Sequence, residues 1–303
     1  MKKALFCLSL LFVFLSLNAM EYKVGLADKF ASDGFVAEAA WQPVTSAGNF
    51  SRLKAAGKNA SALKSSFKVL ADAENIYFNI ICEDPEPDKV RANLSGAHSN
   101  PWANDLVEIF LAPTGYGDEF YQFVISAGGA YWQEFYGERG NIKPDPFSPV
   151  YDIKTIKRSD GWGLEIKIPF SALYMTSANA WKNTWLANVI RYSPQRGENS
   201  SWSKLVNNNH ESDAFNKFTA MPTKPLAFDL RVNSATFKTR EAAADGFIGT
   251  LETEILLLDA PAGNYSLLCN EQSSKLNLKK GTNLLSSRIK LPLAGKNMVK
   301  YVL

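Results

Sequence analysis

Residues 67–82 read FKVLADAENIYFNIIC, and this stretch indicates the fold class most directly. The runs at 67–70 and 76–82 are rich in aromatic and β-branched residues, which is typical of strands. Between them lie Asp72 and Asn75, whose side chains favour tight turns by bonding to nearby backbone groups. The stretch therefore predicts an antiparallel hairpin closed by the loop at 72–75.

The same alternation of strand-like runs and turn residues continues along the chain, and no long segment has a helical period. Turn residues such as Gly128 and Gly161 separate neighbouring runs, as expected for hairpins. This pattern predicts an all-β fold, an antiparallel β-sandwich. Its further strands are expected at residues 106–111, 120–126, 131–135, 151–157, 162–168, 186–192 and 215–218.

A second, smaller domain is expected after Pro222 and Pro225, which interrupt the strand pattern. The first domain is then assigned to residues 20–222 and the second to 226–303. Short strand-like runs in the tail, separated by glycine-containing turns, favour a small immunoglobulin-like β-sandwich. Because the tail is short for seven strands, we expect this domain to be incomplete or to need a docking partner.

The first 19 residues resemble a secretory signal peptide. Lys2 and Lys3 form the positive region, residues 4–17 the apolar region, and Ala19 is a small residue where a peptidase can cut. A membrane anchor is the alternative, but the apolar run is shorter than the roughly 20 residues that span a bilayer. We therefore expect a secreted, periplasmic or cell-surface protein without a membrane span after signal removal.

The composition excludes several classes of function. Of 303 residues, 46% are hydrophobic and 21% charged, as in ordinary globular proteins. The formal net charge of +3 falls to +1 without Lys2 and Lys3, which gives no electrostatic reason to expect a nucleic-acid partner. Three cysteines, one of them in the leader, are too few for a disulfide framework and are not spaced for zinc, and two histidines limit any catalysis that relies on imidazole.

Several short motifs occur in a fixed order across residues 28–221. They are Asp33-Gly34, Trp41, Lys68 to Asp72, Ile76-Tyr77-Phe78, Asp84, WANDLVEIF at 102–110, Trp162 with Glu165, IPF at 168–170, NVIR at 188–191 and Ser201-Trp202. Together these motifs resemble the family 9 carbohydrate-binding modules of the DOMON-like superfamily. The resemblance implies a β-sandwich that binds sugars without hydrolysing them.

Trp102 and Trp202 are the expected aromatic platforms of a sugar site. Sugar rings have apolar CH faces and polar edges, so a site for them combines flat aromatic rings with a few fixed hydrogen-bonding groups. Both tryptophans follow polar stretches and are expected at strand or loop ends. The alternative is that they belong to the sandwich core.

The expected polar groups of the site are Glu108, Gln122, Asn188 and Arg191. Glu108 interrupts an apolar strand, where a buried carboxylate needs a partner. One interpretation places Glu108 and Arg191 against sugar hydroxyls through charge-assisted bonds, and the other pairs them as a structural ion pair. The family resemblance implies that a Trp six residues before a strand Glu contacts sugar, and Trp102 and Glu108 have this spacing.

Asp84 and Asp105 are candidate calcium ligands, because the resemblance implies structural calcium and carboxylates are its usual ligands. A solvated acidic turn at 83–88 is the alternative. No other cofactor is expected.

Three other functions stay open. A sugar-independent surface scaffold needs none of these sites. A haem protein of the same superfamily would use two of Met175, Met221, His98 and His210 as axial ligands. A hydrolase would pair Glu108 with Glu134. For the binding module, the expected partners are a carbohydrate ligand and a separate glycoside hydrolase.

Overall fold

The predicted hairpin is present and forms the centre of a five-stranded sheet. Strands β4 (Ser65–Ala71) and β5 (Asn75–Glu83) pair in antiparallel register, with Phe67 opposite Ile80. Asp72 Oδ1 accepts the backbone N–H groups of Glu74 at 2.7 Å and Asn75 at 2.6 Å. Local side-chain bonds thus close the turn, as the sequence predicts.

The structure is a computed structural model of the 303-residue chain. The predicted signal segment at 1–19 lies outside the described residues except for Ala19, as does most of the predicted domain boundary at 222–225. The described residues are 19–27, 30, 35–52, 61–97, 100–141, 143, 147, 149–176, 180–222, 230–257, 263–269, 272–292 and 299–302.

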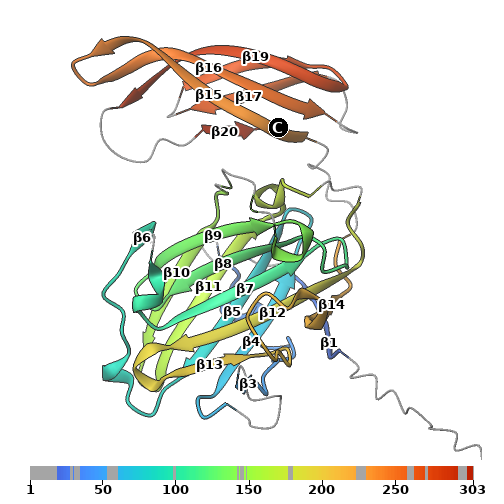
Figure 1. The fold of residues 1–303 in the computed structure, drawn as a ribbon, viewed down its shortest axis with the longest axis vertical. Helices are drawn as coiled ribbons and strands as arrows, with labels where there is room; N and C mark the ends of the chain where they lie inside the picture. Colours follow the sequence, from blue (N-terminus) through green and yellow to red (C-terminus); the bar gives the residue numbers. More distant parts are fainter. Residues whose placement is uncertain are drawn as a thin grey trace, which may run out of the picture.

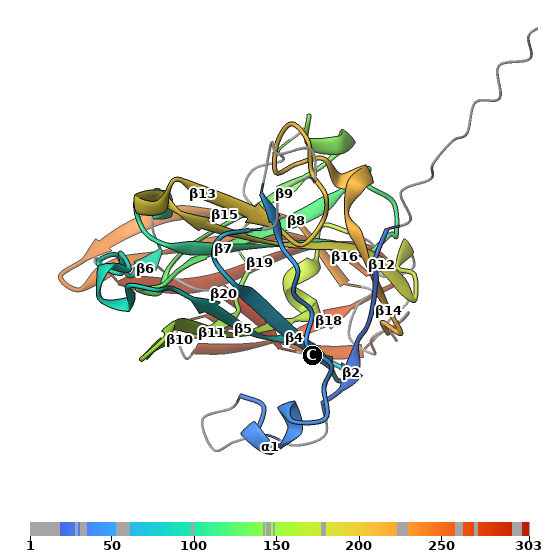
Figure 2. The same ribbon diagram turned by 90° about the horizontal axis from the view of Figure 1, so that it is seen from below.

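Two sheets stack face to face in the first part of the chain, which confirms the predicted all-β sandwich (Figures 1 and 2). Most strand pairs are antiparallel, and the parallel pairs β1–β14, β2–β4 and β6–β9 involve short strands. The nine-stranded sheet contains β1 (Glu21–Lys23), β14 (Asn216–Thr219), β12 (Thr184–Ser193), β7 (Leu106–Ala112), β8 (Phe120–Ser126), β9 (Ala130–Tyr136) and β6 (Gly96–Ala97) in this order. In addition, β13 (Glu198–Ser201) pairs with β12, and β3 (Ser51–Arg52) pairs with β13. The five-stranded sheet has the order β10 (Asp152–Arg158), β11 (Gly161–Pro169), β5, β4 and β2 (Gly25–Leu26).

Helices are short and lie outside the sheets. Helix α1 (Glu38–Trp41) lies on the outer side of the five-stranded sheet (Figure 2), where Trp41 packs with Leu70 and Tyr77. Among the described residues, no helix has the length and apolar composition that a membrane crossing requires. The short 3-10 helices are Pro87–Lys89, Pro101–Ala103, Glu138–Gly140, Phe170–Leu173, Pro194–Arg196 and Ser212–Ala214.

The main core fills the space between the two sheets, and side-chain alternation along each strand determines its members. On β7, Val107 and Ile109 point into this core, whereas Phe110 belongs to a second apolar cluster on the outer face. Gly161, at φ 142°, begins β11, and a Cβ there would lie 2.1 Å from the carbonyl oxygen of Cys82. The hairpin between β10 and β11 therefore requires glycine at this position.

The tail forms two three-stranded sheets that pair with neither sheet of the sandwich. One has the order β15 (Leu230–Ala243), β16 (Gly246–Leu257), β19 (Gly281–Pro292), and the other β18 (Gln272–Leu278), β17 (Gly263–Cys269), β20 (Val299–Val302). The first order matches the A–B–E order of immunoglobulin sheets. The immunoglobulin-like domain stays a prediction, supported by this order.

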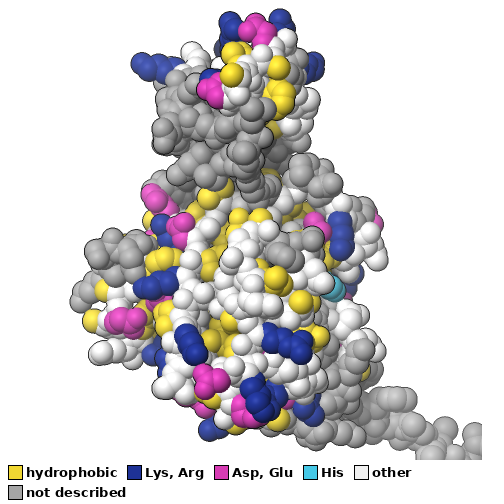
Figure 3. All heavy atoms as spheres, turned by 90° about the vertical axis from the view of Figure 1, so that its left-hand side faces the viewer, with side chains coloured by type: hydrophobic (Ala, Val, Ile, Leu, Met, Phe, Trp, Pro, Cys, Tyr) yellow, Lys and Arg dark blue, Asp and Glu magenta, His cyan; other side chains and the backbone are white. Residues whose placement is uncertain are grey.

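Charges of both signs are interspersed over the face shown in Figure 3, with hydrophobic side chains between them. A nucleic-acid surface would need a stripe of one sign. This face carries no stripe of one sign among the described residues.

Candidate functional site

The outer face of the nine-stranded sheet carries the first cluster of polar side chains. Because side chains alternate along a strand, Glu108 and Phe110 on β7 share the outer face with Phe120 and Gln122 on β8. Glu108 is 2% exposed, although it carries the charge that interrupts an otherwise apolar strand. The structure thus brings together two of the predicted site residues, Glu108 and Gln122.

Glu108 accepts three hydrogen bonds from neutral donors. Trp102 Nε1–H donates to Oε1 at 3.0 Å, while Gln122 Nε2 and Asn209 Nδ2 donate to Oε2 at 2.7 Å and 3.2 Å. Burial raises the pKa of the Glu108 carboxyl, and these three bonds oppose the rise. The carboxylate therefore fixes the Trp102 indole and the Asn209 amide in place.

Residues 203–215 cover this part of the outer face. Leu205 and Phe215 pack with Phe110 and Phe120, so the apolar part of the sheet is closed to water. Above it, the His210 ring lies 4.8 Å from the Tyr136 ring, measured between centroids. This segment explains why β7 is buried on both faces.

Gln122 connects the carboxylate to the covering segment. Its Nε2 donates to Glu108, and its Oε1 accepts the Tyr136 hydroxyl at 3.0 Å and lies 3.3 Å from His210 Nε2. Burial lowers the pKa of the His210 imidazole, as does nearby Lys143. Glu108 and Gln122 thus lie beneath the surface, whereas Asn209 and His210 are half-buried above them.

Trp132 is a site residue that the sequence reasoning missed. It lies on β9, two residues before Glu134, and its ring centroid is 5.3 Å from that of Trp102 with the planes at 63°. Both rings are half-buried, so each of the two adjacent indoles is partly exposed to solvent. Alternation within the predicted strand 131–135 could have placed Trp132 on the same face as Glu134.

Trp202 is not an exposed platform, contrary to the prediction. It is 3% exposed and lies in the main core, 5.1 Å from Phe67 in an edge-to-face contact and 5.7 Å from Phe218. Trp202 directly follows β13, the strand that pairs with β12, and its indole lies between the two sheets. The apolar surface of a ring this large is therefore covered from both sides.

Asn188 is also buried and has a structural role. Its Nδ2 donates to the Ser201 hydroxyl at 2.9 Å, and its Oδ1 accepts the Ser203 backbone N–H at 2.9 Å. These bonds anchor the beginning of the segment that covers Glu108. Asn188 thus supports the site without lining it.

Arg191 lies on the opposite face of the sheet from Glu108, so both interpretations that placed the two residues together are wrong. Glu108 is opposite Ile190 in the register, and Val107 is opposite Arg191, so a shift of one residue reverses the direction of the side chain. Arg191 is 0% exposed, and its Nη1 donates to the Glu83 carbonyl at 2.6 Å.

The predicted calcium ligands have different environments. Asp84 is buried with Arg196 Nη2 at 2.9 Å and Arg191 Nη2 at 3.7 Å, and these two cations would repel a metal ion. Asp105 accepts the Arg91 backbone N–H at 2.9 Å with Oδ2, while its buried Oδ1 has no hydrogen-bond partner in the described part of the chain. Asp84 therefore does not fit calcium, and Asp105 offers a single open oxygen.

The predicted haem ligands do not share a cavity. His210 lies on the outer face of the nine-stranded sheet, whereas Met175 and Met221 pack against or within the core between the sheets. His98 lies outside the described residues. His210 therefore cannot share one iron with either methionine.

Comparison with known proteins agrees with the architecture. The sequence matches the family described as carbohydrate family 9 binding domain-like over residues 32–218. No curated protein matches the chain significantly.

Three solved structures are similar to 66% of the chain. A proposed carbohydrate-binding protein from Bacteroides uniformis has 17% identity, a TM-score of 0.52 and 99% of its own chain covered. A family 9 carbohydrate-binding module from Caldicellulosiruptor kristjanssonii in complex with glucose has 14% identity, a TM-score of 0.47 and 94% of its own chain covered. The structure of such a module from the same organism with cellotriose has 17% identity, a TM-score of 0.45 and 92% of its own chain covered. Since the family match spans more than half of the chain and the first neighbour shares its fold, the protein belongs to the carbohydrate family 9 binding domain-like family.

Proposed function

We propose that the protein is an exported, non-catalytic carbohydrate-binding protein whose ligand lies on the outer face of the nine-stranded sheet. The observation that carries this proposal is the pair of partly exposed indoles, Trp102 and Trp132, one of them fixed by the buried carboxylate of Glu108. Fixed aromatic faces beside amide and imidazole groups suit the apolar faces and polar edges of a sugar. Membership of the family supports the same ligand class.

In this site, the residues divide into contacting and positioning groups. Trp102 and Trp132 would stack on the CH faces of the sugar, and Asn209 and His210 would meet its hydroxyl groups, since all four are half-buried at the surface. Glu108 and Gln122 are buried beneath them and hold their polar atoms. This arrangement differs from the predicted one, in which Glu108 itself contacts the sugar.

The signal-like segment at 1–19 supports export to a secreted, periplasmic or cell-surface location. A binding module of this kind would serve a separate glycoside hydrolase or anchor a cell to a polysaccharide. A sugar-independent scaffold is the competing function, and failure to bind any carbohydrate on a broad glycan array would favour it.

Trp102→Ala should remove carbohydrate binding and lower the melting temperature only modestly, because the ring is half-buried and Glu108 keeps the bonds from Gln122 and Asn209. The array identifies a ligand first, and calorimetric titration then measures its affinity, expected between millimolar and micromolar, about −4 to −8 kcal/mol. Tyr116→Ala, at an exposed aromatic residue that is not among the proposed contacting or positioning residues, is the matched control and should bind normally. Unchanged affinity in the Trp102 variant would place the ligand elsewhere.

Glu108→Gln should change how stability depends on pH. The folded-state pKa of Glu108 is raised by burial, so the folded protein holds this proton more strongly than the unfolded chain does. The difference in unfolding free energy between the wild type and the Gln variant should therefore favour the wild type most below the ordinary carboxyl pKa. This advantage should fall as pH rises through the raised folded-state pKa. The total fall should be about 1.4 kcal/mol for each unit that separates the folded and unfolded pKa values. Urea unfolding at several pH values measures this, with the exposed Glu138→Gln as control; parallel pH profiles would show that burial does not perturb Glu108.

A further inference from the structure

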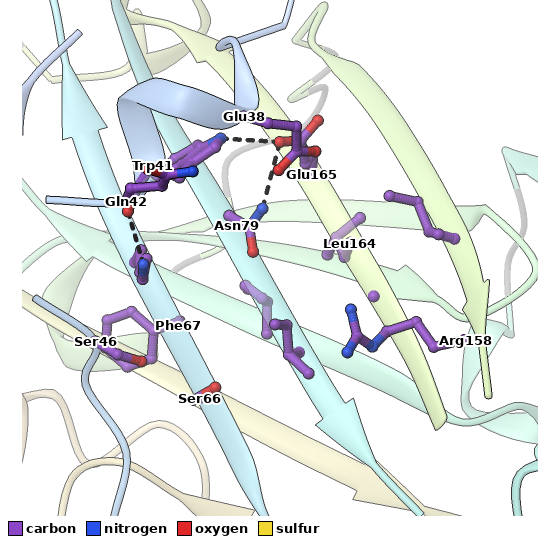
Figure 4. Close-up of a pocket in the computed structure, with 15 residues that line it drawn as sticks. Glu38, Trp41, Gln42, Ser46, Ser66, Phe67, Asn79, Arg158, Leu164 and Glu165 are labelled. Carbon is purple, nitrogen blue, oxygen red and sulfur yellow. Dashed lines mark hydrogen bonds between the residues drawn. The ribbon is translucent and has the colours of Figure 1, made fainter. Parts of the chain in front are cut away.

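A second pocket lies on the opposite outer face of the sandwich, over β4, β5, β11 and β10 (Figure 4). Its volume is about 290 Å³, and helix α1 forms one wall through Trp41 and Gln42. Since it is built on the five-stranded sheet, the whole thickness of the sandwich separates it from Trp102 and Glu108. Nothing in the proposed function uses this pocket.

Three polar side chains form a row across its floor. Lys68 on β4 is opposite Asn79 on β5, and Asn79 is opposite Glu165 on β11. Directly opposite residues on neighbouring strands have Cβ atoms about 5 Å apart. The row therefore offers an ammonium donor, a carboxamide and a carboxylate acceptor at successive positions.

Glu165 is the buried member of this row. It is 3% exposed, and its Oε1 accepts Trp41 Nε1–H at 3.0 Å and Asn79 Nδ2 at 3.4 Å (Figure 4). Burial raises the pKa of its carboxyl, and both bonds oppose the rise. Burying a carboxylate whose hydrogen-bond donors are all neutral costs free energy. Its position at the wall of a cavity therefore suggests a role in binding.

Beside the polar row, the floor is apolar and hollowed at Gly163. Ile81 and Ile156 flank this glycine, and all three line the pocket. A Cβ added at Gly163 would lie 3.5 Å from the Ile80 carbonyl oxygen and from Arg158 Cδ, which is ordinary contact. The strand thus tolerates a side chain here, and the hollow exists because this residue has none.

The distribution of charge selects a neutral ligand. Glu38 and Glu165 lie near each other at one end of the pocket (Figure 4), and they would repel an anion. Lys68, whose Nζ donates to the Trp41 carbonyl at 2.6 Å, would repel a cation. At the other end, Arg158 is neutralised by Asp160, with bonds of 2.8 and 3.1 Å.

We propose that this pocket is a second binding site, which takes one neutral sugar ring or a polyol of similar size independently of the first site. Each hydroxyl group both donates and accepts, so neighbouring hydroxyls can bond to Lys68, Asn79 and Glu165 together. The CH face of the ring lies on Ile81 and Gly163. The volume is near the lower end of the range for small-molecule sites, about 300–1,000 Å³, as a single ring requires.

The two sites can be followed separately because each carboxylate binds one indole N–H. In the full-length protein labelled with ¹⁵N-tryptophan, the Trp41 signal reports on the second pocket and the Trp102 signal on the first, each assigned by its loss in the corresponding Trp→Phe variant. The neutral probes are D-glucose, D-galactose and myo-inositol, and the charged probes are glycine, phosphate and putrescine. We expect at least one neutral probe to shift the Trp41 signal in a saturable manner, in the wild type and in Trp102→Ala alike.

Gly163→Val and Glu165→Gln should each weaken the affinity that this signal reports by tenfold or more, while the matched Lys167→Val on the same face of β11 should not. Glu165→Gln keeps the shape of the side chain and decides the matter if Gly163→Val fails to fold. The proposal is overturned if no neutral probe shifts the Trp41 signal, if charged probes alone shift it, or if the shift disappears in Trp102→Ala. A response of Trp102 without one of Trp41 would support the first site and exclude the second.

Discussion

Trp202→Ala should lower the free energy of unfolding by about 3–5 kcal/mol, the range for removing a large buried aromatic ring. The indole is 3% exposed and contacts Phe67 edge-on at 5.1 Å, so truncation leaves a cavity between the two sheets. Such a cavity relaxes only partly, because strands on both sides hold Phe67 and Phe218 in place. Urea unfolding followed by tryptophan fluorescence and circular dichroism measures the loss.

Trp102→Ala is the matched comparison, since it removes the same side chain from a half-buried position. It should cost much less stability while removing carbohydrate binding. The sharpest contrary result would be a Trp202 variant that keeps wild-type stability and loses the ligand, which would return Trp202 to the role of an exposed platform.

Arg191→Met should also be destabilising, near the lower end of the range of about 3–5 kcal/mol for breaking a buried charge pair, because Asp84 keeps its second cationic partner. The guanidinium is 0% exposed, lies 3.7 Å from Asp84 and donates to the carbonyl groups of Glu83 and Lys64. Removal takes this donor from both carbonyls, of which the Lys64 carbonyl still accepts the Glu83 backbone N–H at 3.0 Å. Arg196 still binds Asp84, so the carboxylate itself keeps one cation.

Arg158→Met provides the control for this second experiment, because its partner Asp160 is exposed and such surface pairs contribute about 0–1 kcal/mol. Equilibrium unfolding in guanidinium chloride gives both values. Carbohydrate affinity of the folded Arg191 variant should be unchanged, because Arg191 and Glu108 lie on opposite faces. A stable Arg191 variant with impaired binding would contradict the assignment.

The two outer faces of the sandwich share one structural feature, a hydrogen bond between an indole and a buried carboxylate. In each case an indole N–H bonds at 3.0 Å to a buried carboxylate, Trp102 to Glu108 on one face and Trp41 to Glu165 on the other. The raised pKa of both carboxyls has burial as its largest cause. A rigid ring beside an acceptor is what sugar recognition needs, and this shared chemistry connects the proposed function with the proposed second pocket.

The sequence by itself determined the features that depend on local chemistry. The turn at 72–75 follows from Asp72 and its own neighbours, and the strands follow from runs of β-branched and aromatic residues. In each of these cases the interacting groups are close along the chain. The spacing of Trp102 and Glu108 pointed to one site only through the family resemblance, and the bond between the indole and the carboxylate is a finding of the structure.

Only the tertiary structure decided which faces are covered and by what. Alternation tells which residues of one strand share a face, but the register between β12 and β7 decides that Arg191 and Glu108 point in opposite directions. Likewise, the burial of Trp202 depends on how the two sheets pack against each other, and the arrival of Asn209 at Glu108 depends on residues 203–215 folding back over the outer face. Such contacts join residues about a hundred positions apart, and their partners are chosen by packing of the whole sandwich, which no local pattern encodes.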